Sequence, residues 1–138
     1  HQAVEISQLN LLLKVLTRKE KLPSLSHNIR VGNSLLEAGD LDTKPFDYKK
    51  EFPEVFGNKG FDVILGNPPY IIVRDRAQNE TYRKLYSTCH QKYSLGVPFT
   101  QRFWDLAIRE GEQVDPGAEA VSPAAGYIGM ITANSFMK

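Results

Sequence analysis

Three features are scarce or absent in the sequence, and each absence excludes a class of protein. The chain has one cysteine, Cys89, which excludes an intramolecular disulfide framework and the multi-cysteine ligand set of a structural zinc site. Apolar runs such as 11–13 and 71–73 are far shorter than the roughly 20 residues of a membrane-spanning helix. With 17 Lys and Arg against 16 Asp and Glu, the charges almost cancel, so any nucleic-acid contact has to be local. We therefore expect a cytoplasmic protein.

The composition indicates a folded chain. Its 138 residues give room for one ordinary domain, and its 41% hydrophobic and 24% charged residues are close to globular averages. Near the start of the chain, apolar side chains recur at intervals of three and four residues, which places them on one face of a helix. They predict an amphipathic helix over residues 1–16, with Ile6, Leu9, Leu13 and Leu16 on its apolar face.

Three apolar stretches predict strands, at residues 29–31, 61–65 and 127–132. The second is bracketed by glycine and proline and has the composition of a strand buried on both faces of a parallel sheet. A helix is predicted over 99–110, between the second and third strands. Strands that alternate with helices indicate an α/β layered fold.

The connections between these elements are polar. Residues 36–59 predict a loop with one short helix, residues 74–98 an insertion or lid loop, and residues 112–125 a linker. In parallel sheets, ligands bind at the carboxyl ends of the strands. The turns at 32–34 and 66–70 both follow predicted strands, so we expect them to share one site.

The turn Asn67-Pro68-Pro69-Tyr70 carries the most chemical information. Two prolines fix the backbone and remove two N–H donors, which leaves an acceptor-rich turn with an aromatic ring beside it. The Asn67 side-chain oxygen and a backbone carbonyl are two acceptors that suit one exocyclic NH2 group, and Tyr70 is suited to stacking on a planar ring. The turn predicts a pocket for an aromatic amine such as adenine. The tetrapeptide alone is equally compatible with a tight turn that ends in a buried tyrosine.

The residues around this turn favour a pocket for an aromatic amine over a tight turn with a buried tyrosine. Residues 61–70, Phe-Asp-Val-Ile-Leu-Gly-Asn-Pro-Pro-Tyr, resemble motif IV of amino-group methyltransferases that use S-adenosylmethionine, in the form typical of N6-adenine DNA enzymes. Residues 3–16 resemble the helix after motif II, residues 31–35 motif III, and residues 126–136 the later strand-turn block, all in family order. The likeness is to the enzymes of type IIG restriction-modification systems and of phage-defence (BREX) systems.

The resemblance implies a Rossmann-like methyltransferase fold that is only partly present, as a partial catalytic domain over 1–138. The first strands, with the glycine-rich cofactor loop, and the last strands would lie outside the sequence, as would the DNA-recognition domain. We expect a central fragment of a larger prokaryotic enzyme, inactive and unable to bind cofactor alone. Unpaired strand edges in such a fragment predict self-association.

The resemblance also implies roles for individual residues. Asn67 and the Pro68 carbonyl accept hydrogen bonds from the amino group of an adenine flipped out of double-stranded DNA, and Tyr70 stacks on that base. Together with Pro69 these residues form the implied catalytic motif. The implied S-adenosylmethionine contacts come from Asn33, Ser34, Asn67 and Pro69, where Asn33 stands at a position more often occupied by Asp in the family. Taken without the resemblance, Asn33 is also compatible with a capping role after a strand.

Other polar residues give weaker signals. Basic residues near the turn are candidates for phosphate contact, although a solvated basic loop explains them equally well: Arg74 and Arg76 first, then Arg83, Lys84 and Lys92. His27 and His90 lie in polar loops without partners at metal-ligand spacing, so no metal site is predicted. Two other functions stay open: methylation of glutamine, as in the release-factor enzymes that share Asn-Pro-Pro-Tyr, and a non-catalytic interaction module.

Overall fold

The computed structural model describes residues 2–16, 25, 27–36, 46–57, 59–109 and 125–132. The chain divides into two compact units, His1–Phe52 and Pro53–Lys138, each of which is described by itself. The predicted linker lies outside the described residues except for Ala125, and so do residues 133–138 of the strand-turn block.

The first unit contains the predicted N-terminal helix. Helix α1 spans Gln2–Leu16, which confirms the helix, but Ile6, Leu9 and Leu13 on its apolar face are all more than half exposed. None of the helices in the described part of the chain has the length and hydropathy needed to cross a membrane. The helix therefore follows the sequence pattern without burying its apolar stripe.

A small aromatic cluster forms the core of the first unit. Phe46 is buried, its ring meets that of Tyr48 edge to face at 4.7 Å, and its N–H donates to the Leu36 carbonyl. Gly32 is required here, because a side chain at this position would overlap Phe46. The short helix α2 (Tyr48–Glu51) begins at Asp47, whose carboxylate accepts hydrogen bonds from the N–H groups of Lys49 and Lys50.

The predicted strand at 29–31 is wrong, because these residues lie outside both strands of the structure. A strand exists only where a neighbour takes up its alternating N–H and C=O groups. The two strands of the described chain pair with each other and lie in the second unit. An apolar pattern alone therefore did not produce a strand at this position.

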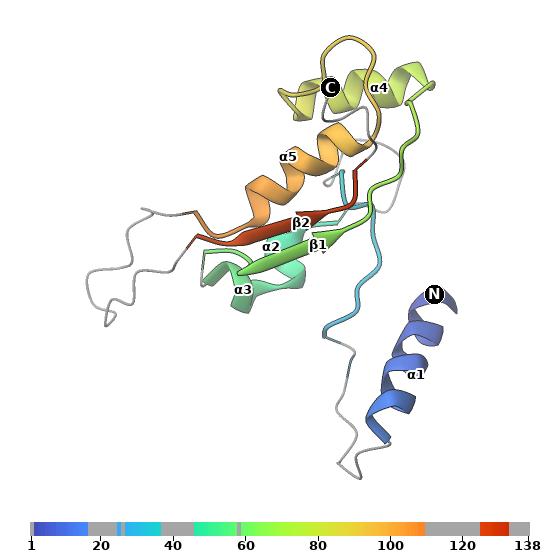
Figure 1. The fold of residues 1–138 in the computed structure, drawn as a ribbon, viewed down its shortest axis with the longest axis vertical. Coiled ribbons are helices and arrows are strands. Elements are labelled where there is room, and N and C mark those ends of the chain that lie inside the picture. Colours follow the sequence, from blue (N-terminus) through green and yellow to red (C-terminus); the bar gives the residue numbers. More distant parts are fainter. Residues whose placement is uncertain are drawn as a thin grey trace, which may run out of the picture. The chain divides into compact units, whose positions relative to one another are not determined.

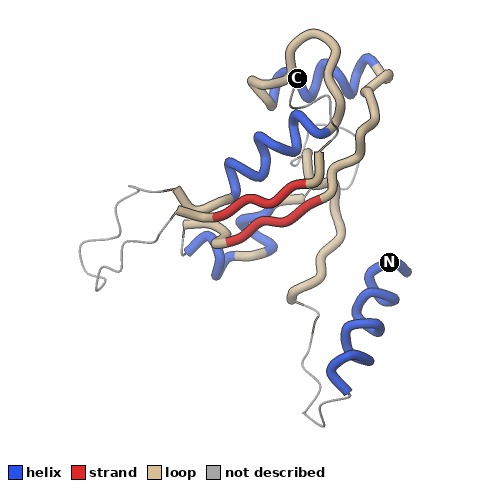
Figure 2. Tube along the Cα trace, viewed as in Figure 1, coloured by secondary structure: helices blue, strands red, loops and turns tan. Residues whose placement is uncertain are grey.

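The second unit is built on two parallel strands, β1 (Val63–Gly66) and β2 (Tyr127–Met130). Val63 pairs with Tyr127 and Gly66 with Met130, so the two strands end together, as Figure 2 shows in red. Both predicted strands are confirmed with shifted bounds. Phe61, the first residue of the predicted stretch, forms a separate bridge with Ala107.

Helix α5 (Gly96–Leu106) lies along the two strands in Figure 1 and contacts β2. It begins three residues before its predicted start, since Pro98 falls in the first turn, where a missing N–H costs nothing. It ends at Leu106 rather than at 110, because Ala107 takes an extended conformation and pairs with Phe61. The long-range pairing overrides the helical pattern there.

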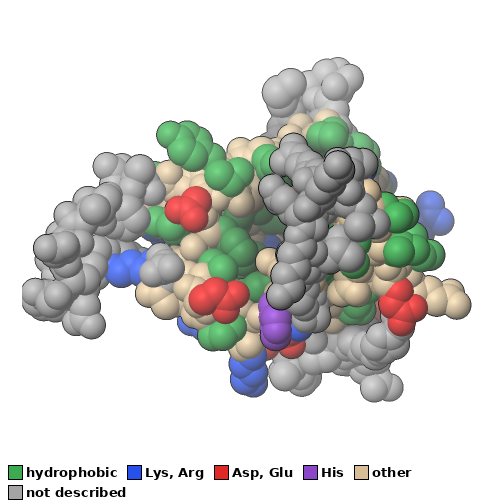
Figure 3. Space-filling view, turned by 90° about the horizontal axis from the view of Figure 1, so that it is seen from below, with side chains coloured by type: hydrophobic (Ala, Val, Ile, Leu, Met, Phe, Trp, Pro, Cys, Tyr) green, Lys and Arg blue, Asp and Glu red, His purple; other side chains and the backbone are tan. Residues whose placement is uncertain are grey.

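The expectation that residues 61–65 form a strand buried on both faces is wrong in this structure. Val63 is 55% exposed and Leu65 77% exposed. A two-stranded sheet with one helix along it leaves one face uncovered, whereas burial on both faces needs a layer on each side. Hydrophobic side chains also reach the surface among charged ones on the face drawn in Figure 3.

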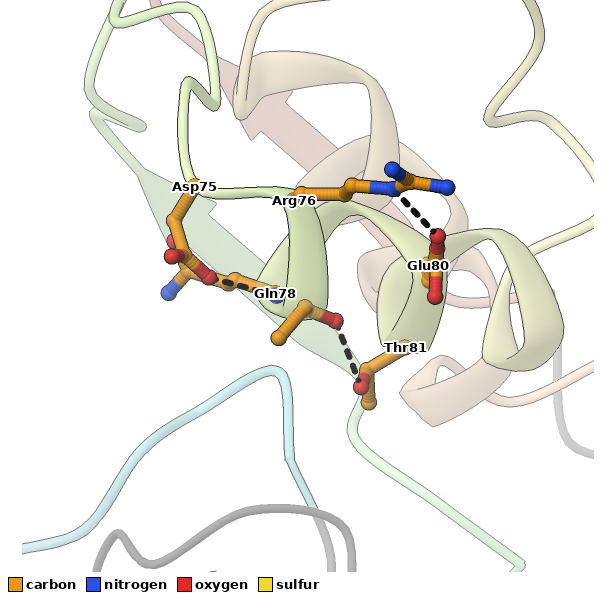
Figure 4. Close-up of polar contacts among 6 residues, drawn as sticks. Asp75, Arg76, Gln78, Glu80 and Thr81 are labelled. Carbon is orange, nitrogen blue, oxygen red and sulfur yellow. Dashed lines mark hydrogen bonds and ion pairs between the residues drawn. The ribbon is translucent and has the colours of Figure 1, made fainter.

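The segment 74–98, predicted as an insertion or lid loop, contains a helix that the sequence analysis missed. Helix α4 spans Arg76–Leu85, and Asp75 caps it by accepting a 2.7 Å hydrogen bond from the Gln78 N–H (Figure 4). Its buried residue is Tyr82, which belongs to a core with Tyr86, Cys89 and Tyr93. The described part of residues 36–59 likewise contains two short helices, α2 and α3 (Pro53–Gly57), where one was predicted.

Candidate active site

The turn Asn67–Tyr70 directly follows β1, as predicted. Pro68 is buried, whereas Asn67, Pro69 and Tyr70 are exposed. The Tyr70 hydroxyl donates to Asn67 Oδ1 across 3.5 Å, at the upper limit of a hydrogen bond. The Asn67 amide is thus loosely oriented by Tyr70 and remains accessible to a ligand.

Two contacts fix the start of this turn. The Ile131 N–H donates to the Gly66 carbonyl at 3.1 Å and thereby continues the β1–β2 pairing past the end of β2. The ring of Phe103, from α5, lies so close to Gly66 that a side chain at this position would overlap it. Glycine is therefore required for close packing of the helix on the strand end.

Pro68 and Tyr70 form part of the wall of an open cleft of about 460 Å³. The cleft lies at the carboxyl ends of both strands, since β2 contributes Met130 and the two residues after it. The remaining wall comes from Ile72, from the loop that joins α4 to α5, and from the first turn of α5. The described residues that line the cleft are Pro68, Tyr70, Ile72, Thr88, His90, Lys92, Tyr93, Ser94, Gly96, Val97, Met130, Ile131 and Thr132. A volume of this size suits a small-molecule or nucleobase ligand.

The loop between α4 and α5 is attached to its surroundings at several points. Gln101 Oε1, on α5, accepts hydrogen bonds from the Thr88 N–H at 3.1 Å and from the Thr88 hydroxyl at 2.9 Å. The Arg83 guanidinium, on α4, donates to the Gln91 carbonyl. At the other end of the loop, Ile72 bridges with Ser94. The loop is thus a fixed wall of the cleft.

Two ionisable groups of this loop are held in their neutral form. Burial raises the pKa of Tyr93 to about 12, and the adjacent Cys89 contributes to the rise. Burial also raises the pKa of the Cys89 thiol. Neither group is therefore suited to act as a base or nucleophile near neutral pH.

The sequence analysis missed much of this cleft. His90 was assigned no role, yet it and Lys92 line the cleft beside Tyr70. One part of the cleft was predictable from the sequence. Because the carboxyl ends of parallel strands lie at the same edge of a sheet, Thr132, at the end of the predicted strand 127–132, is expected near the turn.

Arg74 and Arg76 do not line this cleft. They border a separate groove of about 350 Å³ on α4, together with Asn79, Glu80 and Arg83. Arg76 Nε forms a 3.0 Å ion pair with Glu80, visible in Figure 4. The three arginines make the groove basic, but Glu80 compensates part of that charge.

Asn33 and Ser34 lie in the first unit, so their sharing a site with Asn67 stays a prediction. Asn33 Oδ1 accepts a 3.1 Å hydrogen bond from the Leu35 N–H, which is a local turn contact; because residues 29–31 form no strand, it is not the capping role after a strand that was considered for this residue. Ser34 lines a pocket of about 310 Å³ with Gly32, Arg30 and the aromatic residues Phe46, Tyr48 and Phe52. Its aromatic and hydroxyl groups are chemically suited to an adenine ring.

The second unit thus places the turn Asn67–Tyr70 at the carboxyl end of a parallel strand, with Pro68 and Tyr70 in the wall of a cleft, which is an α/β arrangement. Residues 1–114 match the family model of the Eco57I restriction-modification methylase, and the chain belongs to this family.

Three relatives are similar to parts of the chain. The adenine-specific methyltransferase PglX of Streptomyces coelicolor is 39% identical over 129 residues, covering 80% of this chain and 10% of PglX. The type II restriction enzyme and methyltransferase RM.Eco57I of Escherichia coli is 30% identical over 122 residues, covering 85% of this chain and 11% of the relative. The type II methyltransferase M.BstVI of Geobacillus stearothermophilus is 37% identical over 54 residues, covering 37% of this chain and 9% of the relative. The chain thus spans about a tenth of the length of these relatives, and no solved structure matches it significantly.

Proposed function

We propose that the chain, as part of a longer enzyme, transfers a methyl group from S-adenosylmethionine to the N6 amino group of adenine in DNA. The observation that carries the proposal is the turn Asn67–Tyr70, which follows a parallel strand and contributes Pro68 and Tyr70 to the cleft. Family membership and the names of PglX and RM.Eco57I support adenine as the target and favour it over glutamine.

The chemistry follows from the acceptors of the turn. The nitrogen lone pair of an adenine amine is delocalised into the ring, which makes it a poor nucleophile. Asn67 Oδ1 and the Pro68 carbonyl would accept the two N–H bonds and favour a tetrahedral nitrogen with a localised lone pair. The N–CH3 bond would form as the sulfonium S–CH3 bond breaks, leaving a thioether, and the methylated nitrogen would release one proton to water. Because Pro68 and Pro69 have no N–H, the backbone of these two residues presents carbonyl acceptors and no donor to the amine.

Tyr70 supplies the surface on which the base rests. The residue is 46% exposed and lines the cleft, so it is accessible to a base that enters there. The target amine is paired inside duplex DNA, and the base therefore has to be flipped out to reach this cleft. Arg74 and Arg76 are candidates for the accompanying phosphate contacts, together with Arg83 in the same groove.

S-adenosylmethionine supplies an electrophilic methyl group on a sulfonium when it is bound. The residues of the chain fit part of this cofactor: Ser34 lies in the aromatic pocket of the first unit, and Asn33 retains a second acceptor lone pair after accepting from the Leu35 N–H. Asn67 and Pro69 are exposed after the end of β1 and would be accessible to the cofactor.

We infer that β1 and β2 are two strands of a Rossmann-like sheet in the longer enzyme. Residues 1–138 are then one portion of its catalytic domain, with 74–98 as an insertion or lid loop and 112–125 as a linker. The name of RM.Eco57I supports a restriction-modification role, and the proposal places the enzyme in such a system, or in a phage-defence system, in the cytoplasm of a prokaryote.

The test uses the full-length enzyme with labelled S-adenosylmethionine and DNA, followed by identification of the product nucleosides. The wild type is compared with Asn67→Ala and with Asn10→Ala, a matched change in the exposed part of α1. We expect label in N6-methyladenine, a loss of about 100- to 1,000-fold for Asn67→Ala because one preorganised acceptor is removed, and no loss for Asn10→Ala. Label in a protein glutamine instead would move the assignment to the release-factor type of enzyme.

A further inference from the structure

The cleft contains a cation that the proposed methyl-transfer chemistry does not use. Lys92 lines it together with Pro68 and Tyr70, and His90 lies in the same loop and in the same wall. Among the described residues that line the cleft, none is Asp or Glu. Lys92 is exposed and forms no ion pair with any residue of the described part of the chain. The cleft therefore carries net positive charge and attracts an anion.

The backbone of the loop gives Lys92 a defined position. Gln91 has a φ of 49°, in the left-handed region, and separates the two cleft residues His90 and Lys92. Gln91 itself does not line the cleft, and its carbonyl accepts the hydrogen bond from Arg83. The turn at Gln91 is thus pinned to α4, which favours a preformed cationic wall over a free lysine on a mobile loop.

We propose that Lys92 binds a DNA phosphate next to the extruded adenine. This inference rests on the proposed function and names a substrate contact of the same cleft. A base whose amine reaches the Asn67–Tyr70 turn stays joined to its sugar and phosphates, which must pass the rim of the cleft. A lysine ammonium is a compact point charge suited to phosphate, and no described acidic residue of the cleft competes for it.

The basic groove on α4 is a less favourable place for this particular phosphate. Arg76 is paired there with Glu80 at 3.0 Å, and the groove shares no residue with the cleft of Tyr70. Contacts in that groove are thus better suited to phosphates further along the duplex.

The first test measures how DNA affinity of the full-length enzyme depends on salt. Lys92→Gln is compared with Lys92→Arg, which keeps the charge, and with Lys49→Gln, which removes an exposed lysine of α2. We expect Lys92→Gln to reduce the steepness of log K against log salt by about 0.9, the effect of one lost phosphate contact. Lys92→Arg and Lys49→Gln should keep the wild-type slope.

The second test locates the phosphate. The methylated adenine is found by sequencing the wild-type product, and duplexes are made in which one phosphate beside that adenine is replaced by a neutral methylphosphonate. If Lys92 binds that phosphate, Lys92→Gln weakens binding of the ordinary duplex but not of the neutralised one, because the same contact has already been removed.

Two outcomes would overturn this inference alone. The first is that the salt dependence of DNA binding has the same slope in Lys92→Gln as in Lys49→Gln. The second is that Lys92→Gln loses as much DNA affinity on duplexes neutralised at either flanking phosphate as on ordinary duplexes. Both leave a wild-type enzyme that still methylates adenine. A wild-type enzyme that places no methyl group on adenine in DNA would overturn the proposed function and this inference together.

Discussion

The aromatic ring of Phe103 lies directly against Gly66, the last residue of β1. This contact joins the helix that lines one side of the cleft to the residue that precedes Asn67. The position of the acceptor turn therefore depends on a glycine whose role is close packing. The contact between Phe103 and Gly66 thus connects the stability of the second unit with the geometry of its candidate active site.

Gly66→Ala should damage both stability and methyl transfer, because the added methyl group overlaps Phe103. We expect a loss of about 1–3 kcal/mol in the free energy of unfolding, as for an overpacked core. The matched control is Gly57→Ala in α3, where an added methyl group meets nothing within 4 Å. Urea unfolding of both variants measures the difference, and equal stability of the two would contradict the packing role of Gly66.

Substitutions of Tyr70 separate its ring from its hydroxyl. Tyr70→Phe keeps the stacking surface and loses only a 3.5 Å hydrogen bond to Asn67, so kcat/KM should fall by no more than about tenfold. Tyr70→Ala removes a stacking contact of about 1–3 kcal/mol, or roughly 5- to 150-fold in kcat/KM. Kinetics of methyl transfer to DNA decide the matter: if both variants lose the same activity, stacking is not the role of Tyr70.

Gln101 should control the rigidity of the loop between α4 and α5. Its Oε1 accepts two hydrogen bonds from Thr88, so Gln101→Leu removes both, whereas Gln101→Glu keeps an acceptor in place. We expect hydrogen exchange at the Thr88 amide to accelerate about tenfold in Gln101→Leu, which corresponds to about 1.4 kcal/mol of local opening, with little change in Gln101→Glu. An unchanged exchange rate in Gln101→Leu would show that other contacts hold the loop.

Tyr93 should make the protein sensitive to alkali. Its pKa is about 12 in the folded state against an ordinary value of 10.0, so the folded state holds its proton more tightly than the unfolded state between these values. The stability that this group contributes is complete below about pH 10 and is lost as the pH rises toward 12. The free energy of unfolding should therefore decrease less from pH 9 to pH 11 in Tyr93→Phe than in the wild type. The same decrease in both proteins would contradict the burial of the phenol.

The isolated chain of residues 1–138 should self-associate through its uncovered strand pair. Leu65 on β1 and Tyr127 on β2 are both more than 70% exposed, and a sheet of two strands has unpaired edges. Leu65→Lys should shift the chain toward the monomer in size-exclusion chromatography with light scattering, whereas Leu13→Lys on α1 should not. A wild-type chain that stays monomeric at high concentration would refute this expectation.

Local sequence signals predicted several elements correctly. The spacing of apolar residues predicted α1. The two stretches that became β1 and β2 were identified from their apolar composition, and the first of them also from its flanking glycine and proline. Helix α4 was missed because its exposed face is polar and its buried side is formed mainly by Tyr82, which does not produce a clear apolar stripe. The strand at 29–31 failed for the opposite reason: it has a suitable composition but does not belong to the β1–β2 pair.

The sequence by itself determined the chemistry of the turn, because two prolines, an amide and a phenol fix its acceptors and its aromatic ring whatever surrounds them. Only the tertiary structure decided what the turn faces. Lys92 and Thr132 are distant from Tyr70 along the chain, and they meet around one cleft because parallel pairing aligns the ends of β1 and β2 and because Gln101 and Arg83 hold the intervening loop. Such contacts depend on the path of the whole chain, which no local pattern of residues records.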